Sequence, residues 1–316
     1  MKVLYITGCL GFIGSYVTKA CLEEGWFVYG IDKITYASNL KILDEFKKYP
    51  KFKFEQSDIN EINRLVDCDY FINLAAETHV DNSIRNSKNF LDSNINGVHN
   101  ILELLKDYRR QSYVKPTLIH FSTDEVYGDD DKAHVETDIL KPSNPYSATK
   151  AAADQLILAW SRTYGIPYMI VRPTNNYGIG QYVEKLIPKS CKFLSIEKKI
   201  PVLDKGLPIR VWLHAKDTAN AIVTLIKSGE TNQIYNISGG YQQNNITTIK
   251  KLINCYFGKS IENYEQYLDF DVVRPGHDKI YSLNDDKLRK LGWIPKCNFD
   301  EELVNIVDYY KNNFIW

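Results

Sequence analysis

The sequence shows no excess of charge of either sign and no long hydrophobic run. Among 316 residues, Lys and Arg together number 39, as do Asp and Glu, so the formal net charge is zero. This balance argues against a nucleic-acid-binding surface and against an acidic tail. No stretch of about 18 apolar residues is present, which argues against a membrane span. Glycines at positions 8, 11 and 14 interrupt the N-terminal apolar segment, unlike in a signal peptide, so we expect a cytoplasmic protein.

Cysteine and histidine are also scarce, and neither forms a cluster. The chain has six of each, with no C-x-x-C pair. Scattered thiols are typical of a reducing compartment and exclude both a disulfide framework and a cysteine zinc site. The histidines have no metal-ligand spacing, so we expect no metal cofactor. His120 lies inside an apolar run and is interpreted as a core residue whose hydrogen bonds are satisfied.

Short apolar runs alternate with segments of helical periodicity through the first half of the chain. Strands that are buried on both faces and separated by helices predict an α/β fold, a doubly wound parallel sheet of the Rossmann type. Ligands of such sheets bind beyond the carboxyl ends of the strands. The candidate strands are residues 2–7, 27–31, 53–56, 70–74, 117–122 and 168–172.

The pattern changes after residue 173, where Asn, Gly, Pro and Lys become frequent. We therefore expect two domains, a dinucleotide-binding domain over residues 1–173 and a smaller mixed α/β substrate domain over residues 174–316. Part of residues 211–237 has the pattern of a helix followed by a strand and is compatible with a return to the first domain. The expected boundary is therefore interleaved.

A glycine-rich turn follows the first candidate strand, with the spacing Gly8-x-x-Gly11-x-x-Gly14. Dinucleotide sites need a tight turn, a close backbone approach to the pyrophosphate and a helix N-terminus that faces the anion. Asp32 ends the second strand, where an acidic side chain accepts hydrogen bonds from ribose and repels a 2′-phosphate, which favours NAD over NADP. The alternative is a glycine-rich turn without a ligand. Phe12 and Ile13 lie within the turn, and the ends of other strands add the candidate wall residues Lys33, Asp58, Ile59, Leu74, Ala75, Ala76 and Ser122.

Tyr146 and Lys150 are four residues apart in a segment that follows Pro145, a residue suited to the first turn of a helix. A phenol with a pKa of about 10 is a poor base unless a cation stabilises the phenolate, a role open to Lys150 and to a nicotinamide ring. Taken alone, such a pair is most often a surface pair. Downstream of a dinucleotide motif, it indicates a tyrosine that takes a proton during hydride transfer.

These motifs resemble those of extended short-chain dehydrogenase/reductases. Narrower motifs resemble those of nucleotide-sugar 4,6-dehydratases, and the similarity spans nearly the whole chain. They are the segments Leu-Ala-Ala-Glu-Thr-His-Val-Asp at 74–81, Ser-Thr-Asp-Glu-Val-Tyr-Gly at 122–128, Asn-Asn-Tyr-Gly at 175–178, Glu-Lys-Leu-Ile at 184–187 and Arg-Pro-Gly-His-Asp at 274–278.

The resemblance implies an NAD-dependent lyase that oxidises C4 of a nucleotide-linked glucose, eliminates water across C5 and C6, and returns the hydride to C6. It assigns Glu125 as the base at C5, Asp124 as the acid at C6, and Thr123 as a hydrogen-bond partner near the C4 oxygen. Asp124 must then carry a proton near neutral pH, which burial and the neighbouring carboxylate favour. In a random protein, this acidic pair would more often be a polar turn.

The resemblance also implies a substrate site and a partner. The residues that match contacts to the nucleotide sugar are Ser83, Asn175, Lys185, Leu186, Arg210, Asn245, Arg274 and His277. Leu203 and Val211 depart from the thymidine-type pattern, so UDP-glucose is slightly favoured over dTDP-glucose. A homodimer is expected through helices over residues 86–108 and 146–164. The alternatives are a nucleotide-sugar 4-epimerase, which does not need the acidic pair, and a non-catalytic NAD sensor.

Overall fold

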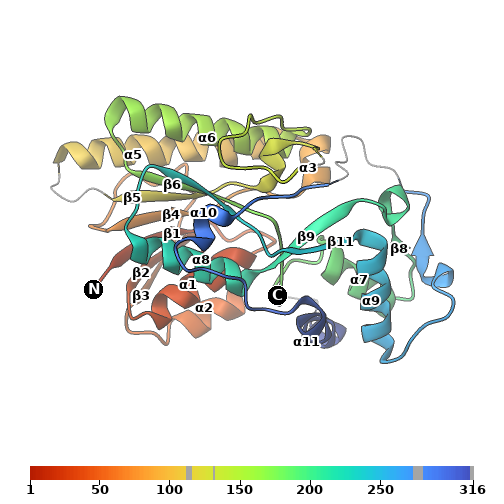
Figure 1. Cartoon of the computed structure of the whole chain (residues 1–316). Helices are drawn as coiled ribbons and strands as arrows, with labels where there is room; N and C mark the ends of the chain where they lie inside the picture. Colours follow the sequence, from red (N-terminus) through yellow and green to blue (C-terminus); the bar gives the residue numbers. More distant parts are fainter. Residues whose placement is uncertain (112–115, 131, 273–279, 314–316) are drawn as a thin grey trace.

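The computed structural model describes residues 1–111, 116–130, 132–272 and 280–313. Its largest element is a seven-stranded parallel sheet, so the predicted fold is confirmed, and each predicted strand agrees with the observed one to within one residue at either end. Helices cover both faces of this sheet (Figure 1). In spatial order the strands are β10 (Gln233–Ile237), β6 (Tyr168–Pro173), β5 (Thr117–Phe121), β4 (Tyr70–Asn73), β1 (Val3–Thr7), β2 (Phe27–Asp32) and β3 (Phe52–Gln56).

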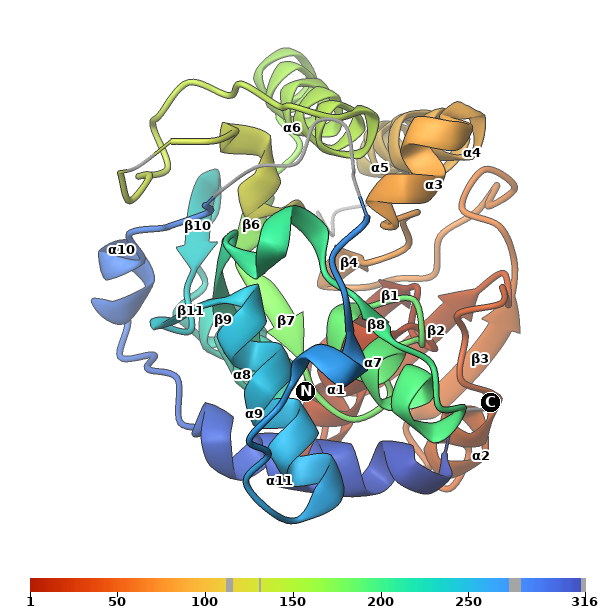
Figure 2. The ribbon, with the colours of Figure 1, turned by 90° about the vertical axis from the view of Figure 1, so that its right-hand side faces the viewer.

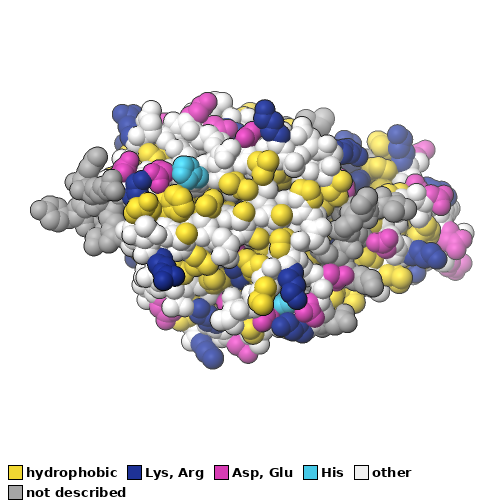
Figure 3. Space-filling view, turned by 90° about the horizontal axis from the view of Figure 1, so that it is seen from above, with side chains coloured by type: hydrophobic (Ala, Val, Ile, Leu, Met, Phe, Trp, Pro, Cys, Tyr) yellow, Lys and Arg dark blue, Asp and Glu magenta, His cyan; other side chains and the backbone are white. Residues whose placement is uncertain are grey.

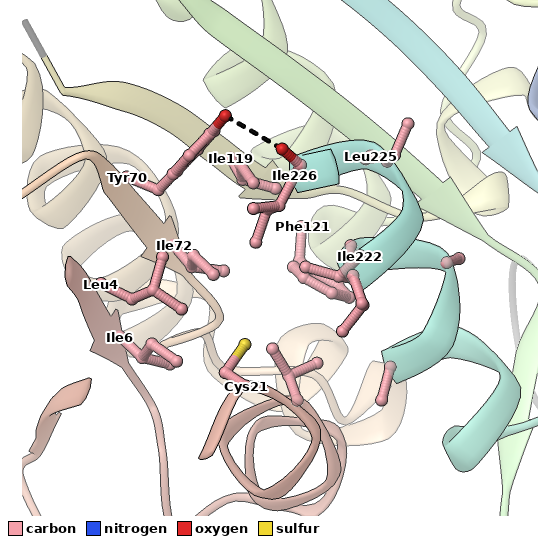
Figure 4. Close-up of a cluster of buried hydrophobic side chains, with 14 of the residues drawn as sticks. Leu4, Ile6, Cys21, Tyr70, Ile72, Ile119, Phe121, Ile222, Leu225 and Ile226 are labelled. Carbon is pink, nitrogen blue, oxygen red and sulfur yellow. Dashed lines mark hydrogen bonds between the residues drawn. The ribbon is translucent and has the colours of Figure 1, made fainter. Parts of the chain in front are cut away.

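Two apolar layers hold the helices against the sheet. On one face, Cys21 of α1 and Ile222 of α8 pack against Ile6 and Ile72 of the sheet (Figure 4). On the other face, Ile101 of α5 and the helix α6 pack against the same strands. The helices of this part are α1 (Phe12–Glu23), α2 (Leu40–Phe46), α3 (Val80–Arg85), α4 (Lys88–Leu91), α5 (Gly97–Gln111), α6 (Pro145–Tyr164), α8 (Ala215–Ser228) and α10 (Asp286–Arg289).

A second part of the chain has its own core at one end of the large sheet (Figure 2). It contains a three-stranded sheet and a two-stranded one, with α11 packed against α7 and α9. Between its segments the chain crosses back, because α8 packs on α1 and β10 pairs with β6. The elements are β7 (Asn175–Tyr177), α7 (Leu186–Ser195), β8 (Ile200–Pro201), β9 (Ile209–His214), β11 (Tyr241–Asn244), α9 (Asn245–Phe257), β12 (Leu268–Asp269) and α11 (Phe299–Asn312). None of the helices in the described residues is long and apolar enough to cross a membrane.

A buried ion pair ties α6 to β6. The Nε and Nη2 atoms of Arg172 lie 3.1 and 2.9 Å from Oδ2 of Asp154, and neither residue is more than 2% exposed. The guanidinium also donates to the Tyr127 hydroxyl at 2.7 Å. Removing two charges from water costs free energy, and their mutual attraction offsets this cost only while both charges are present.

We expect Asp154→Leu to lower the free energy of unfolding by about 3–5 kcal/mol, since it leaves the Arg172 cation buried and unpaired. Urea unfolding followed by tryptophan fluorescence measures the change. The matched control is the double variant Asp154→Leu/Arg172→Met, which removes both charges and should lose less stability than the single variant. A double variant that is less stable than Asp154→Leu would contradict this account.

Candidate active site

A cavity lies beyond the carboxyl ends of β1, β2, β4, β5 and β6, and residues 173–185 of the second part form its other wall. The carboxyl ends of parallel strands meet at one edge, which is why residues distant in sequence gather there. The predicted catalytic residues Thr123, Asp124 and Glu125 line the cavity. So do all the predicted cofactor residues, which are Gly8, Gly11, Phe12, Ile13, Gly14, Asp32, Lys33, Asp58, Ile59, Leu74, Ala75, Ala76, Ser122, Tyr146 and Lys150.

The three glycines of the first turn are required for different reasons. Gly8 has a φ of +68°, and a Cβ atom there would lie 2.7 Å from the Ala75 nitrogen. A Cβ atom at Gly14 would overlap the Gly8 carbonyl oxygen. A Cβ atom at Gly11, by contrast, would lie 3.3 Å from its nearest neighbour, so packing within the protein does not by itself require a glycine there. Gly11 lines the cavity and precedes α1, whose first turn has no acidic residue and no side-chain cap. This backbone fits a pyrophosphate.

Asp32 is held rigidly at the end of β2. Its Oδ1 atom accepts hydrogen bonds from the Ile34 amide and the Ser38 hydroxyl, both at 2.9 Å, and its Oδ2 atom accepts one from the Leu10 amide at 3.0 Å. A carboxylate oxygen can accept more than one hydrogen bond, so the side chain retains capacity for ribose hydroxyls. The fixed negative charge also disfavours a phosphate at the same place.

Lys33 and Asp58 form an ion pair beside Asp32, with 3.4 Å between Nζ and Oδ2. Asp58 lines the cavity, and its Oδ1 atom accepts a hydrogen bond from the amide of Asn60 at 2.9 Å. Burial alone would raise the pKa of Asp58, but hydrogen bonds from Asn60 and the charge of Lys33 hold it below its ordinary value. The Lys33 charge is therefore partly neutralised at this end of the cavity.

The helix that carries Tyr146 and Lys150 begins as predicted. Asn144 is its N-cap, with a capping box to Ser147, and Pro145 occupies the first turn. Ser83 does not line the cavity, and its contact with the sugar stays a prediction. Its hydroxyl accepts a hydrogen bond from the Tyr146 amide at 3.2 Å and donates to the Val80 carbonyl, so it anchors the start of the helix from behind.

The electrostatic environment of Tyr146 differs from the sequence-based expectation. Burial first, and then the Glu125 carboxylate, raise the pKa of the Tyr146 phenol, while a hydrogen bond with Thr123 lowers it. Burial lowers the pKa of Lys150 to about 8, against the opposing effect of Asp154. The expected stabilisation of a phenolate by Lys150 is not seen within the protein alone, because the desolvation of both buried groups dominates.

Asp124 and Glu125 begin a short 3₁₀ turn directly after β5. The Thr123 hydroxyl donates to Oδ1 of Asp124 at 3.1 Å and accepts from the Glu125 amide at 3.4 Å. Asp124 is 3% exposed, and its Oδ2 atom has no hydrogen-bond partner among the described residues. Burial and the Glu125 charge raise the pKa of Asp124 to about 7. Below about pH 7, Asp124 therefore carries a proton, and it stands beside a second carboxyl group next to Tyr146.

The predicted substrate residues fall into three groups. Asn175 and Lys185 line the cavity, and the Nζ atom of Lys185 donates to the Thr78 carbonyl oxygen at 2.9 Å. Leu186, Arg210 and Asn245 are not among the residues that line the cavity. Burial raises the pKa of Asp124, but the Arg210 cation nevertheless acts to lower it, and the Cζ atom of Arg210 lies 4.7 Å from the centroid of the Tyr281 ring. Arg274 and His277 lie outside the described residues.

Two buried amide oxygens lack partners near this region. The Oδ1 atoms of Asn175 and Asn245 are buried without a hydrogen bond among the described residues. A buried acceptor of this kind normally requires a donor, so both are candidates for binding a ligand. Asn245 begins α9, but the cap of that helix is its neighbour Asn244, which accepts from the Thr247 amide at 2.9 Å.

Sequence reasoning missed the aromatic border of the cavity. The rings of Tyr36 and Tyr182 meet edge to face with centroids 5.1 Å apart, and the Tyr36 hydroxyl donates to Glu184 at 3.3 Å. In the sequence, the one indication of this border is the position of Tyr36, four residues after Asp32. Its partners come from the second part of the chain and are 146 or more positions away.

Three comparisons with known proteins agree with this geometry. A family model described as GDP-mannose 4,6 dehydratase matches residues 5–306. The dTDP-glucose 4,6-dehydratase of Haemophilus influenzae is 36% identical over 334 residues, with 99% of each chain covered. A trifunctional Arabidopsis thaliana protein, whose name begins with UDP-glucose 4,6-dehydratase, is 38% identical over 330 residues, which cover all of this chain and 48% of the plant protein.

The fold comparison points to the same group of enzymes. The crystal structure of a dTDP-glucose 4,6-dehydratase from Streptomyces venezuelae, with NAD bound, has a TM-score of 0.90 and 32% identity. The match covers 98% of this chain and 97% of the other. The resemblance found in the sequence motifs is thus confirmed. The chain belongs to the family described as GDP-mannose 4,6 dehydratase, a family of nucleotide-sugar 4,6-dehydratases, which are NAD-dependent lyases.

Proposed function

We propose that this dehydratase converts a nucleoside diphosphate glucose to the 4-keto-6-deoxy sugar and water. The observation that carries the proposal is the Asp124–Glu125 pair beside Tyr146, in which the pKa of Asp124 is raised to about 7. A neutral acid next to a carboxylate base is what an elimination of water requires. A 4-epimerase has no use for this pair.

The first step is oxidation at C4 of the sugar. The Tyr146 oxygen, hydrogen-bonded with Thr123, takes the proton of the C4 hydroxyl as the C4–H bond breaks. The glycine turn and Asp32 would hold NAD, which would supply a hydride acceptor for C4 and a hydride donor for C6. The Thr123 hydroxyl, which donates its one proton to Asp124, would turn from Asp124 to donate a hydrogen bond to the new ketone oxygen. Lys150, one helical turn from Tyr146, places a cation on the same face of α6.

The second step is the loss of water. The C4 ketone acidifies the C5 hydrogen, and Glu125 removes it as a proton. Asp124 gives its proton to the departing C6 hydroxyl, so the C6–O bond breaks and water leaves. A hydride then returns to C6, and the proton held by Glu125 returns to C5. Tyr146 is left with the C4 hydroxyl proton and Asp124 without its own, so the transfer of one proton from Tyr146 to Asp124 through solvent restores both groups. Glu125 thus takes one proton from the sugar and returns it, the proton of Asp124 leaves in the water, and no net oxidant is consumed.

We propose that the two parts of the chain divide the ligands between them. Residues 1–173 would hold the cofactor, and residues 174–316, apart from the segment of 211–237 that returns to the large sheet, would hold the nucleoside diphosphate. Lys185 and Arg210 supply cations, and the unpaired amide oxygens of Asn175 and Asn245 supply acceptors. Arginine and lysine side chains suit a diphosphate because their hydrogen bonds to it are charge-assisted.

The test of the function is the mass of the product formed from UDP-glucose and from dTDP-glucose. The dehydratase yields a product that is lighter by one water and carries a ketone. A product of unchanged mass would identify a 4-epimerase instead, and no product with retained NAD binding would favour a sensor.

We expect a preference for UDP-glucose over dTDP-glucose of about twofold to tenfold in kcat/KM, the size of one aromatic contact, about 0.5–1.5 kcal/mol. Leu203, which begins a 3₁₀ turn after β8, stands where thymidine-type enzymes carry an aromatic residue. Parallel kinetics on the two substrates measure the preference. The matched variant Leu203→Tyr should shift it toward dTDP-glucose, and an unchanged ratio would contradict the role given to this position.

We also propose that the protein is a homodimer in which α5 and α6 of two copies meet. These helices form one outer layer, and hydrophobic side chains are visible across that face (Figure 3). Leu91, at the end of α4 beside them, is 45% exposed, and Trp160 of α6 is partly exposed. Sedimentation equilibrium should give twice the chain mass of 36.5 kDa. Replacing Leu91 with Glu should weaken the dimer, and a monomer at micromolar concentration would overturn the proposal.

A further inference from the structure

A row of buried polar side chains crosses the centre of the large sheet and ends at Lys150. Thr7, Asn73 and His120 belong to the adjacent strands β1, β4 and β5, and they are directly paired in register, Thr7 with Asn73 and Asn73 with His120. Each is at most 1% exposed. Such a row is costly to bury among apolar neighbours unless every member is hydrogen-bonded.

The row is continuous. The Thr7 hydroxyl donates to Oδ1 of Asn73 at 2.7 Å, Nδ2 of Asn73 lies 3.2 Å from Nδ1 of His120, and Nε2 of His120 lies 3.5 Å from Nζ of Lys150. The Ala75 amide donates to the Thr7 hydroxyl at 3.4 Å. The imidazole therefore faces the asparagine with one nitrogen and the catalytic helix with the other.

This arrangement links the histidine tautomer to the charge of the lysine. Because Asn73 donates to Nδ1, the proton of the neutral ring is on Nε2 and points at Lys150. A neutral amine can accept that proton in a hydrogen bond, whereas an ammonium group cannot. When Lys150 is charged, Nε2 must accept, so Nδ1 carries the proton and Asn73 must turn its amide oxygen toward it. The Asn73 amino group then donates to the Thr7 hydroxyl.

The surroundings favour a change of tautomer over a change of charge at His120. Burial and the Lys150 cation hold the pKa of His120 well below its ordinary value, so the ring stays neutral. The charged groups on the other side of Lys150 are Asp154, which is paired with Arg172, and, beyond Tyr146, the Asp124–Glu125 pair. The imidazole is thus the neutral partner that approaches Lys150 from the sheet.

We propose that His120 is a positioning residue for Lys150, and that its tautomer follows the lysine's charge so that the amine keeps a hydrogen-bond partner in both states. The inference rests on the proposed function in one respect, the assignment of Lys150 to the proton transfer at Tyr146. Thr7 and Asn73 extend the row and allow the switch, because a hydroxyl and an amide can each reverse their donor and acceptor roles.

The direct test is the nitrogen-15 NMR spectrum of histidine-labelled protein without substrate. The His120 signals should change from one neutral tautomer to the other as the pH crosses about 8, the pKa of Lys150. In Lys150→Met the tautomer should be the same on both sides of this pH. A single tautomer throughout the titration of the unsubstituted protein would overturn the proposal, whatever reaction the enzyme catalyses. The spectrum of His120→Gln assigns the signals.

Two matched variants test the effect on catalysis. The Asn side chain of His120→Asn can replace only Nδ1, whereas the longer Gln side chain of His120→Gln reaches the position of Nε2. We expect His120→Asn to lower kcat about tenfold to a hundredfold, the effect of one lost hydrogen bond to a charged group, and to move the pH profile of kcat. The KM for the nucleotide sugar and the NAD content should stay within twofold.

The conservative variant His120→Gln should recover most of the lost kcat and the original pH profile. If both variants keep the wild-type kcat and pH profile, the positioning role is wrong. If His120→Asn fails to fold, Thr7→Val breaks the row at its far end and should still move the profile. A change in thermal stability without a change in the pH profile would indicate a purely structural row and would also overturn the proposal.

Discussion

Asp124→Asn is expected to slow the loss of water by about 10²–10⁴-fold, the usual contribution of a positioned general acid. The amide has nearly the shape of the carboxyl group but cannot supply the proton that the C6 hydroxyl needs as it leaves. Oxidation at C4 does not use this proton, so it should continue. The sugar would then stop as the 4-keto-hexose, with its C6 hydroxyl still in place.

Single-turnover experiments separate the two steps. The absorbance of enzyme-bound reduced nicotinamide should appear at nearly the normal rate and then persist, because the elimination of water from the sugar is slow. Glu125→Gln is the matched comparison, because it removes the base and should also block elimination, with loss of deuterium exchange at C5. An Asp124→Asn enzyme in which both steps slow equally would show that Asp124 is not the acid.

The raised pKa of Asp124 has two consequences for pH. The acid form is lost as the pH rises above about 7, so kcat should fall on the alkaline side, and Asp124→Asn should lack this limb. In the unfolded chain an Asp titrates at about 3.9, so between the two values the folded chain binds more protons than the unfolded one. Folding stability therefore falls as the pH rises through this window.

The same argument predicts that Asp124→Asn stabilises the protein more above pH 7 than near pH 4, since Asn carries no charge to bury. Thermal unfolding at the two pH values measures the difference. An equal effect at both pH values would mean that Asp124 is ionised in the folded enzyme and could not serve as the acid.

Tyr146→Phe is expected to lower kcat by about 10²–10⁴-fold and to leave NAD binding intact. The phenol oxygen is the atom assigned to take the C4 proton, and it is hydrogen-bonded with Thr123. Phe keeps the ring at the start of α6, and the glycine turn and Asp32 are unaffected. Steady-state kinetics with UDP-glucose and calorimetric titration of NAD give the two values.

Tyr164→Phe is the matched control, because Tyr164 ends the same helix and is 39% exposed, away from the cavity. It should retain normal kcat. If Tyr146→Phe keeps more than about a tenth of the activity, another group must take the proton, since positioned acid–base groups contribute at least 10²-fold. Retained NAD binding with lost turnover would also exclude the sensor alternative.

Residues whose roles depend on near neighbours were predictable from the sequence. Gly8 and Asp32 stand at the ends of two strands, and each pattern of strand, turn and helix specifies its own geometry. Arg210 is different, because it acts on Asp124 from β9, a strand of the three-stranded sheet that lies far along the chain from β5. For Ser83 the sugar contact stays a prediction, and only the tertiary structure shows its hydroxyl facing the backbone of Tyr146.

The electrostatics were the least predictable part. The burial of Asp124 beside Glu125 was expected to raise its pKa, and the structure agrees. Burial raises the pKa of Tyr146 and lowers that of Lys150, so it favours the neutral forms of both groups. The attraction between a phenolate and an ammonium group favours the charged forms, and no sequence pattern shows which effect dominates. His120 was interpreted only as a satisfied core residue, because its contact with Lys150 requires the packing of α6 on β5.

The contacts of Tyr36 with Glu184 and of Lys185 with Thr78 join opposite walls of the cavity. We expect these contacts to slow the release of a dinucleotide bound in the cavity, because they would have to open before it leaves. In the proposed reaction the hydride taken from C4 returns to C6 within one turnover, so the reduced cofactor must stay bound until then. With the cofactor retained, we expect the rate to be independent of the ratio of oxidised to reduced nicotinamide in the surrounding solution.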